Sequence, residues 1–334
     1  MRLIERVWFE GDKAKFILVP LLLPLSVLFF FVSSLRKWLF AKGIQSAYQA
    51  SVPVIIVGNI GVGGNGKTPV VLALIEFLES QNYRVGVISR GYGGRAPHYP
   101  YLLDTNARVE HSGDEPFLIY QRKGIPVCVG ADRSASIELL VEQGCNIIVA
   151  DDGMQHYQLA RDIEIAVVDG KRRFGNGLLL PAGPLRELPS RLSSVDYVIC
   201  NSGQAQGGEI PMSLSAGRIV HLQTGEKLTS QEFLKRYRQV NAVAGIGSPD
   251  RFFATLQTLG FELTHTQGFV DHHHYQASEL LPLANETTPL LMTEKDAVKC
   301  LDFDLAHTWY LTVDAKLPDE FYQSLANKLT EHCS

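Results

Sequence analysis

The sequence predicts an α/β protein: a P-loop NTPase-like domain on a largely parallel sheet, a second and smaller α/β lobe, and an N-terminal hydrophobic helix. Short apolar runs with strand character alternate with helix-like segments along most of the 334 residues, as is typical of a parallel sheet covered by helices. A glycine-rich loop follows the first of these runs, and a long uncharged stretch precedes it. A chain of this length can bury a sizeable core and suits two domains.

The glycine-rich loop lies between a strand predicted at 54–57 and a helix predicted to end at about residue 79. It fits the pattern G-x-x-x-x-G-K-[ST] at every fixed position. Glycines let backbone N–H groups approach phosphate oxygens, the lysine would reach the β- and γ-phosphates, and the threonine hydroxyl would hold Mg²⁺. A chance glycine-rich turn is the alternative, but the flanking strand and helix are the context that the motif requires. The predicted ATP-binding residues are Gly61, Val62, Gly63, Gly64, Asn65, Gly66, Lys67 and Thr68.

The uncharged stretch covers residues 16–35, and twenty such residues match the thickness of a bilayer core. Pro20 and Pro24 would kink a helix here, which membrane helices tolerate better than soluble ones. A cleaved signal peptide is disfavoured, because acidic residues precede the stretch and export would separate the P-loop from ATP. A buried soluble helix would show a polar face, and none is visible. The stretch is therefore predicted to associate with a membrane, either spanning it or lying in one leaflet.

Charge and cysteine content argue against two classes of protein. The net charge of −4 gives no general reason to expect a nucleic-acid partner. The five cysteines are odd in number, widely spaced and without a C-x-x-C pair. This pattern argues against a disulfide framework or a structural zinc site and suits a reducing compartment.

The remaining pattern divides the chain into two α/β units. In the first unit we expect a helix at 135–143 and strands at 54–57, 85–89, 126–130, 146–150, 163–168 and 196–200. A segment rich in Gly, Gln and Ser at 203–215 marks a boundary. Beyond it we expect an extended piece at 218–223, strands at 240–244, 289–292 and 308–312, and a helix from the loop at 245–249 through residue 259. The expected division is 1–45 for the membrane-associating helix, 46–205 for the P-loop domain, 206–234 for a linker with extended strands, and 235–334 for the C-terminal lobe.

Two carboxylates, Asp151 and Asp152, follow the apolar strand predicted at 146–150. In P-loop enzymes an acid at this position holds Mg²⁺, directly or through water. An Asp that merely opens a turn is the alternative. His156 comes a few residues later, near the same strand end, and suits either an active-site or a structural role.

For each of the other polar clusters, more than one interpretation of its role remains open. Asp114 and Glu115 precede a helix-like run, where they would cap a helix, or serve as a general base or a second metal contact. Arg186 lies in a loop constrained by Pro and Gly, so it would neutralise transferring charge or belong to a surface turn. The segment 293–296 mixes acids and a lysine at a strand end, and helix capping by its threonine explains it nearly as well.

Three adjacent histidines follow Asp271. Successive side chains of an extended segment point to opposite faces, so the three are poorly placed to ligate one zinc ion. A histidine paired with a carboxylate that positions or tunes it is the better interpretation.

Taken together, these motifs resemble the tetraacyldisaccharide 4′-kinase family of Gram-negative bacteria, across almost the whole chain. One departure is Met154, which stands where an aromatic residue is usual in DDGFQH and should not touch the chemistry. The resemblance rests on the N-terminal hydrophobic helix, GGNGKTP, SRGYGG (89–94), SGDEP (112–116), DDGMQH (151–156), LLPAGPLRE (179–187), DHH (271–273) and MTEKDAVKC (292–300).

The resemblance implies a kinase that uses ATP and Mg²⁺ to phosphorylate the 4′-hydroxyl of a tetraacyldisaccharide 1-phosphate, a lipid A precursor, giving lipid IVA. It also implies a place at the cytoplasmic face of the inner membrane, and two lobes joined by a two-stranded connection with the site between them. By motif match, Asp114 would be the base and His272 its partner from the second lobe. The other implied site residues are Lys67, Asp151 and Asp152 with Mg²⁺ and its water, and Glu115, His156 and Arg186 in roles less defined.

A membrane-associated P-loop ATPase switch acting on a protein partner is the alternative function. Such switches usually carry a second lysine early in the phosphate loop, where this chain has Val62, and they do not need the DHH segment. The pattern therefore favours the kinase, with a lipid disaccharide as the partner, no nucleic acid, and no obligate protein partner evident.

Overall fold

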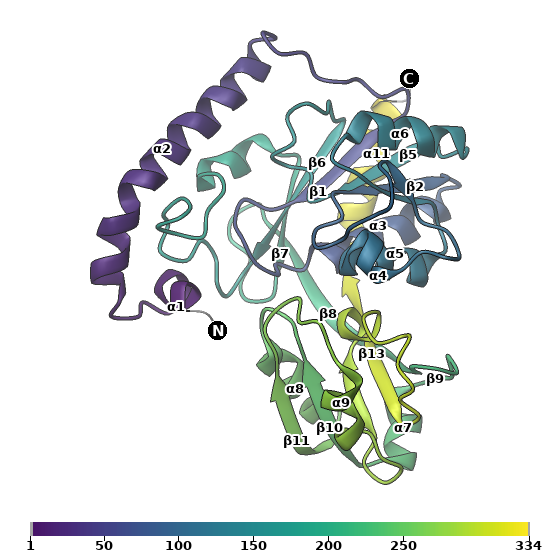
Figure 1. Cartoon of the computed structure of the whole chain (residues 1–334). Helices are drawn as coiled ribbons and strands as arrows, with labels where there is room; N and C mark the ends of the chain where they lie inside the picture. Colours follow the sequence, from purple (N-terminus) through teal and green to yellow (C-terminus); the bar gives the residue numbers. More distant parts are fainter. Residues whose placement is uncertain (1–2, 333–334) are drawn as a thin grey trace.

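The structure is a computed structural model that describes residues 3–332 (Figure 1). Two helices, α1 (Leu3–Phe9) and α2 (Lys15–Ala41), precede the first strand. The first lobe contains β1 (Val54–Gly58), α3 (Lys67–Ser80), β2 (Val85–Ser89), β3 (Tyr101–Leu102), α4 (Val109–Ser112), α5 (Asp114–Lys123), β4 (Val127–Val129), α6 (Arg133–Glu142), β5 (Ile147–Asp151), β6 (Ile163–Asp169), the 3-10 helix η1 (Pro189–Ser194) and β7 (Tyr197–Asn201). The remaining elements are β8 (Ile210–His221), β9 (Lys227–Leu228), α7 (Ser230–Arg236), β10 (Gln239–Ala244), α8 (Pro249–Thr258), β11 (Glu262–Gly268), α9 (Ala277–Leu280), the 3-10 helix η2 (Leu281–Leu283), β12 (Leu290–Thr293), α10 (Glu294–Ala297), β13 (Thr308–Lys316) and α11 (Asp319–His332).

One sheet runs through both lobes, in the order β11-β10-β12-β13-β8-β7-β6-β1-β5-β2-β4-β3, with β9 paired to β8. The strands β7, β6, β1, β5, β2 and β4 of the first lobe are all parallel to one another, as the alternating sequence pattern predicts, and the short β3 pairs antiparallel with β4 at the sheet edge. β8 joins the lobes, because its start pairs in parallel with β7 and the rest pairs antiparallel with β13. β8 and β13 therefore form the expected two-stranded connection (Figure 1).

The carboxyl ends of β1 and β5 lie next to each other at one edge of this sheet, because Val57 pairs with Asp151. In open parallel sheets this edge is where ligands bind. β1, β5 and β2 are buried along their whole length, so side chains on both sheet faces are covered by helices. The sheet thus brings the phosphate loop and the acids that follow β5 to the same place.

The end of the chain returns to the first lobe. Phe321, Leu325 and Leu329 of α11 belong to the same buried cluster as Val70 and Leu74 of α3. Figure 1 shows α11 among the helices of the first lobe. The structure therefore differs from the expected range of 235–334 for the C-terminal lobe, because β13 carries the chain back and α11 covers the first lobe.

The strands predicted in the first unit are present within one residue of their expected bounds. Three strands differ from expectation. β8 begins at Ile210, inside the segment interpreted as a boundary, and β3 and β11 were not predicted at all. β3 has only two residues, β11 is an exposed, polar edge strand, and the start of β8 mixes buried and exposed residues, so none of them shows the apolar run that marks a buried strand.

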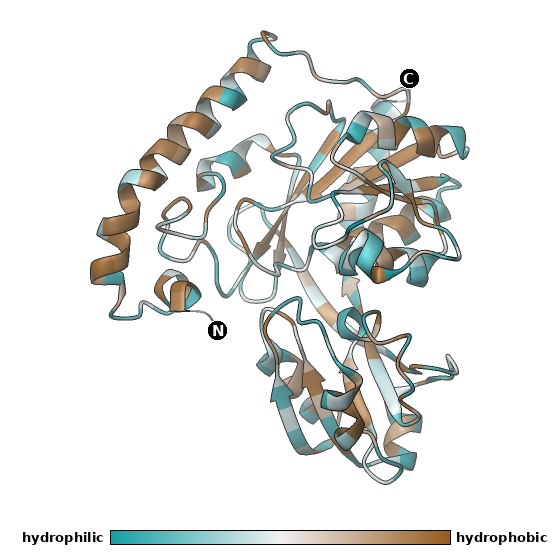
Figure 2. Cartoon of the chain, viewed as in Figure 1, coloured by the Kyte–Doolittle hydropathy of each residue, from teal (hydrophilic) through white to brown (hydrophobic). Residues whose placement is uncertain are grey.

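α2 continues through Pro20 and Pro24 as one helix of 27 residues. Among residues 3–332 it is the helix that is long and apolar enough to cross a membrane, with a mean hydropathy of 2.6. Most of its large apolar side chains are exposed, and Phe16 is 74% exposed. Figure 2 shows that hydrophobic residues dominate α2 along its length, beside the first lobe.

The cysteines of the described residues are free thiols in the core: Cys128, Cys145, Cys200 and Cys300. The fifth, Cys333, lies outside the described residues.

Candidate active site

The phosphate loop, residues 61–68, joins β1 to the first turn of α3. Gly66 has φ +90°, and a Cβ there would lie 2.4 Å from Asn201 Nδ2, so the loop requires glycine at this position. The Asn201 amide also donates to the Asn65 carbonyl at 3.0 Å and holds the loop against the end of β7. The N–H groups of the first turn of α3, a helix of 14 residues, have no intrahelical partner and suit phosphate oxygens.

Two cations meet at Asp152. Lys67 Nζ lies 3.6 Å from Asp152 Oδ1, and Arg186 Nη1 donates to both oxygens of Asp152 at 3.1 and 2.9 Å. Arg186 is held close to the phosphate loop, because its backbone N–H donates to the Ile60 carbonyl at 2.7 Å. Burial acts to raise the pKa of Asp152, but Lys67 and Arg186 hold it below its usual range. The predicted Lys67, Asp152 and Arg186 are therefore together at the phosphate loop.

Asp151 has a different environment from its neighbour. Its side chain is 1% exposed, and its Oδ1 has no hydrogen-bond partner among the described residues. Burial and the nearby charge of Glu115 raise the pKa of Asp151 to about 7. A buried carboxylate without a partner fits a hard cation, and Thr68 in the first turn of α3 offers a second oxygen.

Magnesium suits this pair of oxygens, because it is commonly held by one or two protein ligands together with substrate phosphates and water. Among residues 3–332 no group of three or more His, Cys, Asp or Glu side chains is arranged to hold a metal ion. The site residues thus fit Mg²⁺ bound together with a nucleotide.

Asp114 and Glu115 form the first turn of α5, where the preceding residue is glycine. Gly113 has φ +84°, and a Cβ there would lie 2.4 Å from the Tyr92 carbonyl, so the loop after β2 packs directly on the start of α5. Gly113 is the N-cap of α5, and no side chain caps the helix. The capping interpretation of Asp114 and Glu115 was therefore wrong, and both carboxylates are available for other contacts.

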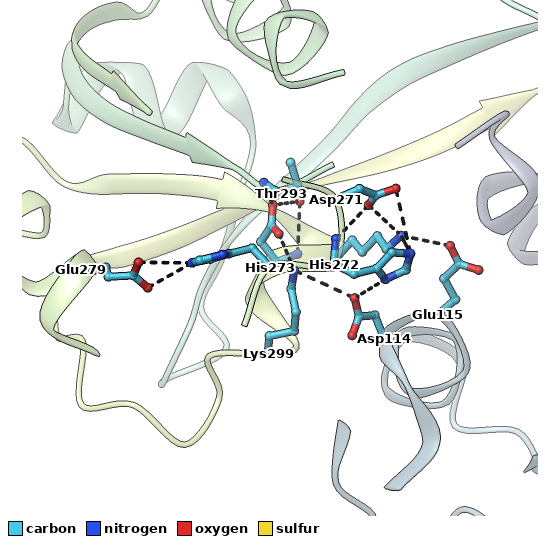
Figure 3. Close-up of polar contacts among 11 residues, drawn as sticks. Asp114, Glu115, Asp271, His272, His273, Glu279, Thr293 and Lys299 are labelled. Atoms are coloured by element: carbon cyan, nitrogen blue, oxygen red, sulfur yellow. Dashed lines mark hydrogen bonds and ion pairs between the residues drawn. The ribbon is translucent and has the colours of Figure 1, made fainter. Parts of the chain in front are cut away.

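The Asp114 carboxylate contacts the second lobe. Its Oδ2 lies 3.0 Å from Nδ1 of His272, which is 158 positions later in the chain (Figure 3). Burial acts to raise the pKa of Asp114, but the His272 hydrogen bond and the charges of Lys299 and Lys295 hold it below its usual range. The pairing implied by the resemblance is thus present in the structure, and it keeps Asp114 ionised.

Glu115 also contacts the second lobe, through Lys295. Lys295 Nζ donates to Glu115 Oε1 at 3.1 Å and lies 3.4 Å from Asp271 Oδ1. Burial acts to lower the pKa of Lys295, but Glu115 and Asp271 raise it above its usual range. Burial likewise acts to raise the pKa of Glu115, but Lys295 and Lys67 hold it below its usual range. Both groups are therefore charged at neutral pH.

The lobes meet on the other side of the phosphate loop as well. Arg172, after β6, donates to the Gly247 carbonyl at 2.8 Å, and Arg251 of α8 lies 3.0 Å from Asp169. A Cβ on Gly247 would lie 3.8 Å from the Gly64 nitrogen. The loop at 245–249 therefore lies against the phosphate loop, and the second lobe contacts the site from two directions.

The adjacent histidines of the second lobe have different partners. His272 contacts Asp114, whereas His273 Nε2 lies 3.1 Å from Glu279 Oε2 and its ring stacks on Phe269 at 4.4 Å. Figure 3 shows the two rings directed apart. This agrees with the alternation of side chains along an extended segment.

His156 lies among basic side chains rather than among the acids. Burial, together with the charge of Arg133 and other arginines, lowers the pKa of His156 to about 4. Arg133 is itself buried, and its Nη2 donates weakly to the Asp151 carbonyl at 3.4 Å. The imidazole of His156 is therefore neutral at neutral pH.

Several site residues were not among the sequence predictions, namely Lys295, Lys299, Asp271, Arg133 and Gln155. The sequence singled out 293–296 at a strand end but left helix capping as an equal explanation. Both are true, because the Thr293 side chain accepts from the Asp296 N–H at 3.1 Å while Lys295 reaches the first lobe. Gln155 lies within the DDGMQH motif but was given no role there, and Arg133 carries no local pattern that distinguishes it from an ordinary helix residue.

The family model described as tetraacyldisaccharide-1-P 4′-kinase (LpxK) matches residues 18–330. This chain belongs to the tetraacyldisaccharide 4′-kinase family. A tetraacyldisaccharide 4′-kinase of Colwellia psychrerythraea is 52% identical, over 98% of this chain and 97% of the relative. One of Aliivibrio salmonicida is 49% identical, again over 98% of this chain and 97% of the relative.

The fold of the family is also matched among solved structures. A crystal structure of the "apo" form of LpxK from Aquifex aeolicus in complex with ATP has a TM-score of 0.77 and is 26% identical. The match covers 94% of this chain and all of that one. The two-lobed α/β architecture is thus shared with a kinase of the family that binds ATP.

Proposed function

We propose that this protein transfers the γ-phosphate of ATP to the 4′-hydroxyl of a tetraacyldisaccharide 1-phosphate, a lipid A precursor. The contact of Asp114 with His272 beside the phosphate loop carries the proposal. The contact helps to keep the Asp114 carboxylate ionised, which supports its role as the base. Family membership supports the identity of both substrates.

Asp114 accepts the proton of the 4′-hydroxyl while the hydroxyl oxygen bonds to the γ-phosphorus and ADP leaves. Lys67 and Arg186 neutralise charge on the transferring group, and Asp152 holds both cations in position. Thr68 and Asp151 would hold Mg²⁺, which neutralises charge on the phosphates when it is bound. Glu115 holds Lys295 at the lobe contact, and neutral His156 lies near Arg133 and other arginines of the first lobe and α2.

We further propose that α2 lies in one leaflet at the cytoplasmic face of the inner membrane, where ATP is available. Ser26, near the middle of α2, donates to the Leu179 carbonyl at 2.9 Å and accepts from the Ala182 N–H at 2.9 Å. A spanning helix would have hydrocarbon around its middle, and a polar loop of the first lobe cannot lie there. An in-plane helix buries its outer apolar face while the lobe stays in water.

Cysteine labelling in sealed inverted membrane vesicles tests this orientation. Ala14→Cys and Ile44→Cys lie at the two ends of α2, and an impermeant maleimide should label both from the ATP side. The unaltered protein controls for its native cysteines. If one position is labelled in sealed vesicles and the other only after the vesicles are opened, α2 spans the membrane.

The activity is tested with purified protein, ATP, Mg²⁺ and the disaccharide lipid. The expected product is heavier than the lipid by one phosphate, and ATP consumption should depend on the lipid. If ATP is consumed at the same rate without the lipid, and the mass of the lipid does not change, the ATPase switch is favoured instead.

A further inference from the structure

Two ammonium groups of the second lobe lie beside the Asp114–His272 pair and have no part in the mechanism above. Lys299 Nζ lies 3.9 Å from Asp114 Oδ2, and Lys295 Nζ lies 3.5 Å from His272 Nε2. Lys295 belongs to α10, and Lys299 follows that helix. One short segment therefore delivers two positive charges to the pair.

The Lys299 side chain is buried and is held in place by buried neighbouring groups. Its side chain is 5% exposed, its Nζ donates to Asp296 Oδ1 at 2.8 Å, and it lies 4.9 Å from the centre of the Tyr275 ring. Asp296 is fully buried and also accepts from the Gly245 N–H at 2.9 Å and from Thr293 Oγ1 at 2.6 Å. This packing fixes the ammonium group beside Asp114, where a nearby cation favours the ionised carboxylate.

Lys295 determines which nitrogen of His272 carries the proton. An ammonium group can only donate, so the Nε2 that it approaches acts as the acceptor. The ring proton then lies on Nδ1, which faces Asp114 Oδ2 at 3.0 Å. Asp271 Oδ2 is 3.9 Å from the same Nε2, but this carboxylate is also paired with Lys295.

Both contacts leave the other oxygen of Asp114 available. Among residues 3–332, the hydrogen bond and the ion pair of the Asp114 carboxylate are both made by Oδ2. Oδ1 is therefore the oxygen that faces an incoming hydroxyl. The titratable and charged groups around Asp114 are His272, Lys299 and Lys295 of the second lobe, with Asp271 beside His272 and Glu115 next in α5.

We propose that Lys299 and Lys295 are positioning residues that keep this pair in a single form, with Asp114 ionised and a ring proton of His272 on Nδ1, directed at Asp114. The inference rests on the proposed function, in which Asp114 is the base. Lys299 acts mainly on the charge of Asp114, and Lys295 acts mainly on the tautomer of His272. Neither lysine needs to touch the substrate.

The test compares Lys299→Met with the unaltered protein across pH, with kcat/KM for the lipid as the readout. Loss of the cation raises the pKa of Asp114, so the variant loses ionised base as the pH falls. The ratio of variant to unaltered kcat/KM should therefore be lower at about pH 5 than at about pH 8, and it should fall further as the pH approaches about 4. Taking this ratio cancels the titration of groups that both proteins share, such as Asp151.

Lys299→Arg retains the charge and is the matched comparison. Its ratio to the unaltered protein should not vary with pH, even if imperfect packing lowers the rate. Lys227→Met, on the exposed strand β9, should match the unaltered protein throughout. KM for ATP should stay within about twofold in all of these variants, because the phosphate loop is unchanged.

If Lys299→Met does not fold, Lys295→Met carries the test, since Lys295 is also a cation that lowers the pKa of Asp114. A ratio that does not vary with pH in the Met variants, or that varies equally in Lys299→Arg, overturns the inference. Failure of the proposed function is a distinct result, because the unaltered protein would then give no phosphorylated lipid at any pH.

Discussion

The two lobes contribute different chemistry to one site. The first lobe holds the groups to which the proposed function assigns phosphate and Mg²⁺, namely the phosphate loop, Asp151, Asp152 and Arg186, and it also carries Asp114. The second lobe contributes His272, Lys295 and Lys299, whose contacts go to Asp114 and Glu115. Nucleotide binding should therefore depend on the first lobe, whereas the second lobe should control the state of the base.

The largest effect is expected at the point where the two lobes meet. Asp114→Asn keeps the shape of the side chain but removes the base, so turnover should fall by about a hundred- to ten-thousandfold. ATP binding, measured by calorimetry, should stay within about twofold, because Asp114 is outside the phosphate loop. A rate near that of the unaltered protein would contradict the assignment of the base.

Lys67→Ala should weaken ATP binding as well as turnover, in contrast to Asp114→Asn. The lysine neutralises phosphate charge, so turnover should fall by about a hundred- to a thousandfold and ATP binding should weaken as well. The exposed Lys227→Ala on β9 is the control and should change neither quantity. Unchanged ATP affinity in Lys67→Ala would show that the triphosphate is not bound at this loop.

His272→Ala should give a smaller effect, because Asp114 is still present as the base and only the histidine that orients it is lost. A fall in kcat of roughly ten- to a hundredfold, with KM for ATP unchanged, is expected. His273→Ala is the matched control, since the neighbouring His273 pairs with Glu279 inside the second lobe and should change kcat by less than about twofold. Equal losses in the two variants would show that the DHH segment is needed only for folding.

The smallest expected effect is a change in the stability of the folded protein when Asp151 is replaced. Its pKa is about 7 in the folded protein, above the ordinary value of 3.8, so the folded state holds more protons between these values. Stability therefore falls as pH rises through this window and stays lower above it. In Mg²⁺-free buffer at about pH 8, Asp151→Asn should raise Tm by a few degrees, because no buried charge remains.

Thermal unfolding with and without Mg²⁺ and nucleotide checks this prediction. Ligand should stabilise the unaltered protein and have less effect on Asp151→Asn. The exposed Asp302→Asn serves as the control and should leave Tm unchanged. A lower Tm for Asp151→Asn without Mg²⁺ would contradict the raised pKa.

The sequence by itself determined the parts of the protein that local patterns encode. The run at 54–57, the phosphate loop and the start of α3 follow from buried strand character, glycine geometry and a helix start, each of which depends on neighbours in the chain. The acids after β5 were found for the same reason. Resemblance supplied the pairing of Asp114 with His272, which no spacing rule could derive across 158 positions.

Only the tertiary structure decided how distant polar residues meet. α11 returns to the first lobe, β8 and the polar edge strand β11 complete the sheet, Lys299 lies beside Asp114, and Lys295 lies beside His272. The sequence singled out the segment that holds Lys295 but not these contacts, because a lysine near a helix cap has the same local pattern whether it faces water or a carboxylate. Its role is determined by what the fold packs against it, and the charge of Asp114 depends on that packing.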